Sequence, residues 1–169
     1  AIGAEAVGEI LAILENPESS EMQIGLANWA LAFIGDRAPD ALREAACSDN
    51  NRIRKAAISA LGSQIQSLDD GQAKELLTNA LGDPCSEIRS EAATLLGKLE
   101  DSEWAEPLLI PALSDPDNWV RKNSALALMK LGAINSIPHL KGRIAIENDQ
   151  IIRNVLDPVS YTHLRAHET

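Results

Sequence analysis

The chain has 169 residues, enough for one domain with a sizeable core, and 45% of them are hydrophobic although only 3% are aromatic. β-Branched and aromatic residues are too sparse for a β-sandwich, whereas the many alanines and leucines suit closely packed helices. The net charge of −10 disfavours nucleic-acid binding, because a phosphate backbone would be repelled unless one face were locally basic.

Apolar residues recur along most of the chain at the three- and four-residue spacing of an amphipathic helix. Short turn signals interrupt this pattern at 35–36, 67–71, 100–102 and 132–135. The pattern predicts a lone helix, then four helix pairs, then a short final helix. In chain order the predicted helices cover 3–15; 16–35 with 38–47; 51–66 with 70–81; 86–99 with 103–113; 117–131 with 135–146; and 149–157. Pro111 should shorten or kink its helix.

A sequence motif repeats at the first helix of successive pairs. Segments 49–62, 83–97 and 115–132 each begin with Asp, reach an aliphatic–Arg pair and continue into Ala and Leu. The arginines are Arg54, Arg89, Arg121 and, in a last partial unit, Arg153, at spacings of 35, 32 and 32 residues. In the first unit Ile24 stands where the arginine is expected. Because each pair is amphipathic and cannot bury its own apolar face, we expect stacked pairs with a continuous core.

This pattern of Asp, aliphatic-Arg, Ala and Leu-Gly resembles HEAT repeats, in particular the short bacterial kind first described in phycobilisome lyase subunits. The resemblance covers about 16–157. It implies an all-α fold, an armadillo-like or HEAT-type α-solenoid of about four helix pairs with a partial helix at each end. We therefore expect a HEAT-like repeat domain at 1–157, truncated at one or both ends.

The same resemblance implies a role for the repeated charges. In the family, the turn Asp and the helix Arg of successive units form a buried ladder, and the Asp is also well placed to cap the helix that follows. We therefore expect these residues to be structural. The expected ladder residues are Asp49, Arg54, Asp83, Arg89, Asp115, Arg121 and Arg153.

Residues 158–169, PVSYTHLRAHET, do not continue the helical pattern. They resemble the conceptual translation of sequencing-adaptor read-through, a transposase mosaic end followed by its primer extension. They hold the single tyrosine of the chain, Tyr161, and two of its three histidines, His163 and His167. We predict a non-native, adaptor-derived tail and exclude it from functional reasoning.

The rest of the chain offers little for catalysis. His139 is its one histidine, and two isolated cysteines without a CxxC motif indicate neither a metal site nor a disulfide framework. The His-Glu dipeptides that hold iron in the HEAT-like deoxyhypusine hydroxylase occur here only as His167-Glu168, inside the predicted tail. We expect no catalytic residue, no cofactor and no metal, and a chain that is not an enzyme.

The cysteines and the first residues bear on the compartment. Isolated cysteines in a helical chain are typical of a reducing compartment, and Glu5 and Glu9 interrupt an N-terminal stretch that lacks a basic region, so no signal peptide is indicated. No segment is long and apolar enough to span a bilayer. We expect a cytoplasmic protein whose true N-terminus is missing, since the chain starts at Ala1.

In HEAT-like solenoids the second helices line the concave face, so the resemblance implies that polar residues on these helices contact a partner. Trp29 lies on the apolar side of its helix, and we expect it in the core. Trp104 and Trp119 either pack internally or anchor a partner. The candidate partner-binding residues are Asp40, Arg43, Glu44, Lys74, Glu75, Asn79, Trp104, Glu106, Trp119, His139 and Lys141.

If the array is cut at both ends, the end helices should leave apolar faces partly exposed, and such patches promote self-association. The residues concerned are Val7, Ile10, Leu11 and Leu14 at one end and Ile151, Ile152 and Val155 at the other.

The leading functional hypothesis is a protein–protein interaction scaffold that binds another protein through the concave face. Nucleic acid is an improbable partner, and no membrane span is expected. The alternative is a bilin (phycobilisome) lyase subunit or a chaperone of a tetrapyrrole protein. That alternative depends on family analogy, which is a weak guide to function.

Overall fold

The computed structural model describes residues 2–34, 37–62, 64–65, 68–99 and 103–156. Every regular element in these ranges is a helix, which confirms the all-α prediction. The chain forms two compact units, Ala1–Leu76 and Leu77–Thr169, and each is described here by itself. The predicted adaptor-derived tail lies outside the described residues, so that interpretation and the domain boundary at 157 remain predictions.

The helices follow the predicted pairs closely, with most ends within about three residues of the expected positions. Their bounds are α1 Ile2–Glu15, α2 Glu21–Ile34, α3 Pro39–Ala45, α4 Asn51–Gly62, α5 Asp70–Leu81, α6 Ser86–Leu96, α7 Ala105–Ala112, α8 Asn118–Lys130, a 3-10 helix (η3) Ile134–Ser136, α9 Ile137–Ile146 and α10 Gln150–Leu156. Helix α7 has 8 residues and contains Pro111, in agreement with the predicted shortening. No helix in the described ranges combines the length and apolarity needed to cross a membrane.

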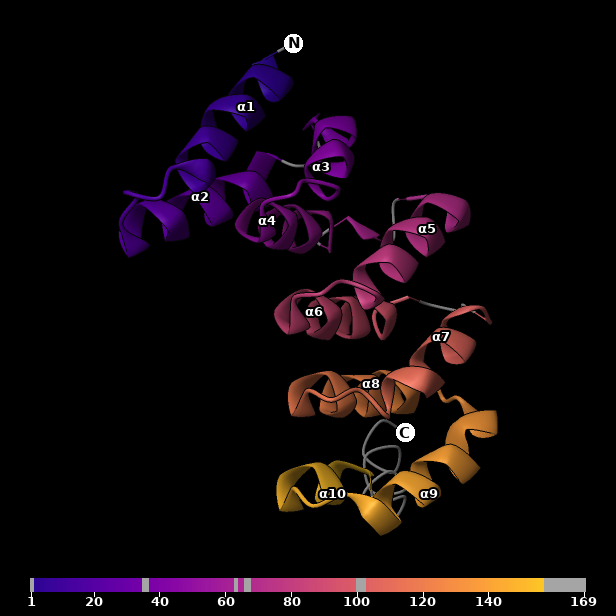
Figure 1. The fold of residues 1–169 in the computed structure, drawn as a ribbon. Coiled ribbons are helices and arrows are strands. Elements are labelled where there is room, and N and C mark those ends of the chain that lie inside the picture. Colours follow the sequence, from indigo (N-terminus) through magenta and orange to yellow (C-terminus); the bar gives the residue numbers. More distant parts are fainter. Residues whose placement is uncertain (1, 35–36, 63, 66–67, 100–102, 157–169) are drawn as a thin grey trace, which may run out of the picture. The chain divides into compact units, whose positions relative to one another are not determined.

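In the first unit, α1 packs against α2 and α4, while α2 and α3 also contact α4 (Figure 1). Each of these helices contributes a leucine with no exposed surface, namely Leu14, Leu31, Leu42 and Leu61. These residues lie on the apolar faces that the helical periodicity indicated. Burial of such side chains is the main stabilising contribution to a helix pair that cannot cover its own apolar face.

In the second unit, α6, α8 and α10 stack as one layer, with α7 and α9 beside it (Figure 1). Helices α6 and α8 approach very closely at Gly97, just past the end of α6. A methyl group on Gly97 would lie 2.8 Å from the Cα of Ala127, closer than atoms can pack. The glycine is therefore required by the helix spacing and not by its backbone angle, since its φ is −73°.

The end of α8 shows how glycine also stops these helices. Gly132 has a φ of 63°, in the left-handed region that glycine adopts without strain. The N–H of Ala133 donates to the carbonyl of Leu128, and the N–H of Gly132 donates to that of Met129, both at 3.1 Å. These two bonds satisfy carbonyls that the helix itself leaves open and fix the turn toward α9.

The exposure of several apolar residues differs from the sequence-based expectation. At the N-terminal end Ile10 and Leu11 are half-buried, as expected, whereas Val7 and Leu14 are buried. At the other end Ile152 is buried, and the side chains of Ile151 and Val155 are not among those that the structure describes. Trp29 is 66% exposed and is not a core residue, so the prediction for Trp29 was wrong. The side of α2 that is buried carries Ala27 and Leu31, whereas Trp29 lies on the opposite, exposed side of the helix.

Candidate functional site

The turn before each repeated first helix has the same local hydrogen bond. One side-chain oxygen accepts the backbone N–H two residues further on: Ser48 from Asn50 (3.2 Å), Asp83 from Cys85 (2.8 Å), Asp115 from Asp117 (2.9 Å) and Glu147 from Asp149 (3.2 Å). This bond holds the turn in the shape that starts the next helix.

The repeated arginine closes the same turn from the other side. Its guanidinium donates to the carbonyl of the residue six positions earlier: Arg54 to Ser48 (2.9 Å), Arg89 to Asp83 (2.9 Å), Arg121 to Asp115 (3.0 Å) and Arg153 to Glu147 (3.1 Å). The turn residue, the helix start and the arginine therefore form one unit that recurs four times in the described chain.

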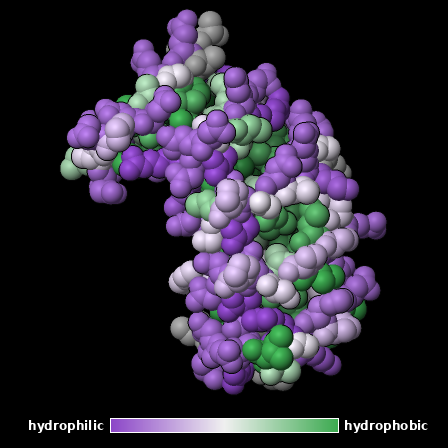
Figure 2. Space-filling view, in the orientation of Figure 1, coloured by the Kyte–Doolittle hydropathy of each residue, from purple (hydrophilic) through white to green (hydrophobic). Residues whose placement is uncertain are grey.

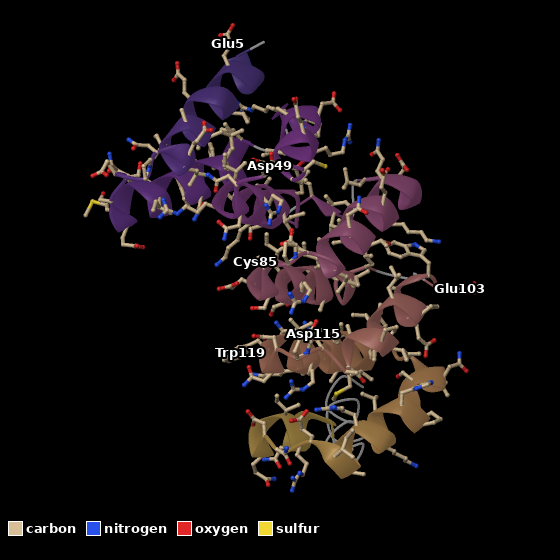
Figure 3. All side chains as sticks on the ribbon, viewed as in Figure 1. Glu5, Asp49, Cys85, Glu103, Asp115 and Trp119 are labelled. Carbon is tan, nitrogen blue, oxygen red and sulfur yellow. The ribbon has the colours of Figure 1, made fainter. Side chains whose placement is uncertain are left out.

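In the second unit the same arginines also reach the turn of the next repeat. Arg89 donates to both carboxylate oxygens of Asp115, from Nε and Nη2, each at 2.8 Å. Arg121 binds Glu147 in the same two-pronged way at 2.9 and 3.0 Å. Figure 3 shows Asp115 between α6 and α8. The geometry brings charged residues 26 positions apart in sequence into direct contact.

Glu147 is the most enclosed of these charges. Its side chain is 1% exposed, and Arg143 on α9 binds the same carboxylate at 2.9 Å. The hydrogen bonds from Arg121 lower its pKa to about 2 against the opposing effect of burial, and the bonds from the Asp149 N–H and Arg143 act in the same direction. Glu147 is therefore ionised at neutral pH.

Asp115 has the same electrostatic character. Burial acts to raise the pKa of Asp115, but the hydrogen bond from Arg89 and the N–H of Asp117 outweigh burial and leave the pKa lowered. A carboxylate that stays charged near neutral pH is poorly suited to exchange protons as a general acid or base. These residues hold neighbouring repeats together, and the arrangement suggests no catalytic role for them.

Sequence reasoning missed two members of this set. Glu147 takes the place of the expected aspartate, and Ser48, not Asp49, occupies the position equivalent to Asp83 and Asp115. The constant spacing of six residues before each arginine could have identified both. The predicted cap is also corrected: Asp117, two residues after Asp115, caps α8 by accepting the N–H groups of Trp119 and Val120.

The candidate partner-binding residues of α3 and α5 lie mostly at the surface. Asp40 and Glu44 are exposed, and Arg43 is half-buried and forms an ion pair with Asp40. The three candidates on α5, Lys74, Glu75 and Asn79, are also exposed.

The candidates of the second unit are more varied. His139 and Lys141 are exposed on α9. Trp119 is 58% exposed at the start of α8, where Figure 3 places it at the edge of the layer. The ammonium of Lys122 lies 4.5 Å from the centre of its ring, a cation–π contact that holds the indole at the surface.

Trp104 and Glu106, at the start of α7, lie in a different environment. Both are half-buried, and each has a buried polar atom for which the described residues provide no hydrogen-bond partner: Nε1 of Trp104 and Oε1 of Glu106. The other oxygen of Glu106 accepts from Nδ2 of Asn135 at 3.3 Å. Unsatisfied buried polar atoms are costly and require an explanation, such as a ligand or a water.

An open cleft of about 810 Å³ adjoins Glu106. Its walls come from the ends of α6 and α8, the start of α7 and η3, with Lys98, Glu103, Glu106, Lys130 and Asn135 among the lining residues. A cleft of this volume lies within the range of small-molecule sites. Elsewhere, the described residues contain no group of three or more His, Cys, Asp or Glu side chains arranged to hold a metal ion.

Comparison with known proteins agrees with the helical-repeat fold. A family model for HEAT repeats matches residues 73–156. The bilin biosynthesis protein MpeU of Synechococcus sp. (strain WH8020) is 41% identical over 151 residues, which cover 89% of this chain and 51% of MpeU. The chain therefore spans about half the length of this curated relative.

Two solved structures share the fold. One comes from the complex of CpcE and CpcF of phycocyanin lyase from Nostoc sp. PCC7120, with a TM-score of 0.71, 21% identity and coverage of 90% of this chain and 96% of that chain. The other is an engineered protein, with a TM-score of 0.59, 19% identity and coverage of 92% and 76%.

The chain has the all-α fold of a HEAT-type solenoid that the repeated turn motif indicated, and residues 73–156, just under half of its length, match the family model for HEAT repeats. More particularly, it is similar in sequence to a bilin biosynthesis protein and similar in fold to a chain of a phycocyanin lyase complex, as the resemblance to phycobilisome-lyase repeats implied. The expectation that the chain is not an enzyme is contradicted by MpeU, the 41%-identical relative, which is named for bilin biosynthesis.

Proposed function

We propose that this chain is a bilin lyase subunit, or a closely related chaperone of a tetrapyrrole protein. The observation that carries the proposal is the 41% identity to a bilin biosynthesis protein over 89% of the chain. Fold alone would not suffice, because HEAT-like repeats serve many functions. The scaffold hypothesis is retained in a narrower form: the repeats present a surface that binds a protein partner, and the same chain binds the bilin.

The cleft beside Glu106 is the best candidate for the bilin. A bilin is an open-chain tetrapyrrole with pyrrole N–H groups and anionic propionates. Glu106 lines the cleft, and its Oε1, which has no hydrogen-bond partner among the described residues, is suited to accept a pyrrole N–H. Lys130, exposed at the rim, is suited to a propionate. In this proposal the chain binds and orients the bilin.

A protein partner is the second part of the proposal. The phycocyanin lyase structure is a complex of two proteins, CpcE and CpcF. We infer that exposed helix surfaces of this chain likewise contact a second protein, and Trp119 is a suitable anchor because a large exposed aromatic residue can be buried on binding. His139 and Lys141 on α9 offer a polar surface of the kind that surrounds such anchors.

Two measurements test the proposal. Titration of the purified chain with phycocyanobilin should change the absorption spectrum of the bilin and give saturable binding. Addition of the chain, with its own partner if one co-purifies, should increase bilin attachment to an apo-phycobiliprotein. If the chain neither binds bilin nor alters attachment, the proposal is wrong. If it binds the apo-phycobiliprotein and not the bilin, the scaffold hypothesis is the better account.

The cleft has its own matched control. Glu106→Gln removes the carboxylate charge with little change in shape and should weaken bilin binding by at least tenfold, as expected for a charge-assisted hydrogen bond in a partly buried site. Glu75→Gln makes the same change on the exposed surface of α5 and should leave bilin binding unchanged. Equal affinities for the two variants would place the bilin elsewhere.

A further inference from the structure

Helix α2 carries four large apolar side chains that point into solvent. Met22, Leu26, Trp29 and Phe33 are 77%, 61%, 66% and 69% exposed. Their spacing of four, three and four residues places them on one face, and we call them the α2 stripe. Figure 2 shows that the surface of the chain in view is mostly hydrophilic, so such a stripe is unusual for this protein.

The two aromatic rings of the α2 stripe are arranged as one surface. Trp29 and Phe33 stack with their centroids 5.4 Å apart and their planes inclined by 17°. Stacked rings have little rotational freedom left to lose, so a partner that covers them incurs a small entropic cost. Gly25 lies beside the stripe with open space around it, which lets a second helix approach closely.

The equivalent face of a later repeat is a helix-packing face. When Ile24 is aligned with Arg121, Leu26 corresponds to Asn123 and Phe33 to Lys130. On α8, Nδ2 of Asn123 donates to Oγ of Ser90 on α6 at 2.9 Å. The α2 stripe therefore occupies the side on which one first helix packs against another. Leu26 and Phe33 are more apolar than their counterparts on α8.

We propose that the α2 stripe is the interface with a second copy of this chain, formed by two α2 helices packed antiparallel about a twofold axis. The spacing of the four side chains, four, three and four residues, is the same from either end of the stripe. An antiparallel pair sets Met22 against Phe33 of the other copy and Leu26 against Trp29, so that both aromatic residues meet aliphatic ones. This self-matching is what a twofold interface requires.

The charges at the two ends of α2 favour the antiparallel arrangement. Glu18 and Glu21 lie at its beginning, and Arg37 lies three residues after its end. Antiparallel packing places the acidic end of one helix near the basic end of the other, whereas parallel packing would set the glutamates together. From Met22 to Ile34 the helix has no charged residue, so no charge is buried at the centre.

The buried area is sufficient for a dimer of modest affinity. Since a large aromatic side chain has on the order of 150–250 Å² of surface, the four exposed side chains together offer on the order of 500 Å² per copy. Two copies would bury on the order of 1,000 Å², near the lower limit for specific interfaces. The net charge of −10 opposes association of two copies, so the dimer should tighten when salt screens that repulsion.

Sedimentation equilibrium of the full chain, at concentrations from about 1 to 100 μM and at two salt concentrations, tests the proposal. The expected result is a monomer–dimer equilibrium that becomes tighter at the higher salt. Trp29→Glu should weaken the dimer by at least tenfold, because the change occurs twice in a twofold interface. Circular dichroism should show unchanged helicity, since Trp29 is exposed in the single chain.

Ile146→Glu is the matched control. It replaces an apolar residue that is 65% exposed with the same charged residue, on α9, and should leave the dimer intact. The proposal is overturned if the wild-type chain remains monomeric throughout, if Trp29→Glu associates as well as wild type, or if the two variants weaken association equally. A monomer would leave the α2 stripe to a helix of a different protein.

Discussion

Neutralising Glu147 is the sharpest test of how the repeats are held together. Glu147→Gln keeps the size of the side chain but removes the negative charge between Arg121 and Arg143. Because the pKa of Glu147 falls from 4.5 to about 2 in the folded chain, its ionised form contributes roughly 3 kcal/mol at neutral pH. Breaking a buried ion pair from one side costs a similar amount, about 3–5 kcal/mol.

The pH dependence of this contribution has a defined direction. A carboxylate with a lowered pKa stabilises the folded state above the pKa of the unfolded chain, and this stabilisation is lost as the pH falls through the folded pKa. The difference between wild type and Glu147→Gln should therefore be full at pH 7 and should decline between about pH 4.5 and pH 2. Below that range both chains are neutral at this position.

Urea unfolding followed by circular dichroism at pH 7, 4 and 2.5 measures the effect, and thermal unfolding at pH 7 provides a second measure. A loss of roughly 3 kcal/mol corresponds to a fall of about 6–12 °C in Tm for a chain of this size. Glu9→Gln removes an exposed charge from α1 and should remain within about 0.5 kcal/mol of wild type. The reasoning fails if Glu147→Gln is as stable as Glu9→Gln at pH 7, or if its deficit is the same at every pH.

Two further predictions concern packing, and both can be measured by urea unfolding. Leu96→Ala removes a fully buried side chain of α6 and should lower the free energy of unfolding by about 2–5 kcal/mol. Ile146→Ala, on the exposed end of α9, should lower it by less than about 0.5 kcal/mol. A similar loss from both variants would contradict the assigned core. Gly97→Ala should destabilise the chain by about 1–3 kcal/mol through its clash with Ala127. Gly142→Ala is the control: Gly142 lies inside α9 with open space around it, and this substitution should stabilise the chain by up to about 1 kcal/mol. If Gly97→Ala also stabilised the chain, α6 and α8 would not be tightly packed at Gly97.

The exposed α2 stripe shows what helical periodicity cannot provide. Helix α2 is apolar on two opposite sides, one with Ala27 and Leu31 and the other with Met22, Leu26, Trp29 and Phe33. Which side is covered depends on where the neighbouring helices lie, and the sequence of α2 contains no information on that. Trp29 was therefore placed in the core by the sequence and at the surface by the structure.

The fold itself was largely determined by local sequence. Each helix follows from short-range spacing and from turn residues such as Gly132, and both act within a few residues of the position concerned. The repeat length then fixed the pairing of first and second helices. For this reason the element order was predictable from one sequence, and Pro111 could be assigned its shortening effect on α7.

The charged contacts between repeats were decided only by the tertiary structure. Arg89 meets Asp115 and Arg121 meets Glu147 across 26 residues because stacked helices bring one turn beside the next. A search for repeated aspartates could not find Glu147. Its side chain is one methylene longer than that of aspartate, and its carboxylate binds the guanidinium of Arg121 in the same two-pronged way. The sequence determined where helices begin and end, since those are local hydrogen-bonding choices. Only the packing of helices against one another decided which charges are enclosed and which apolar face remains open.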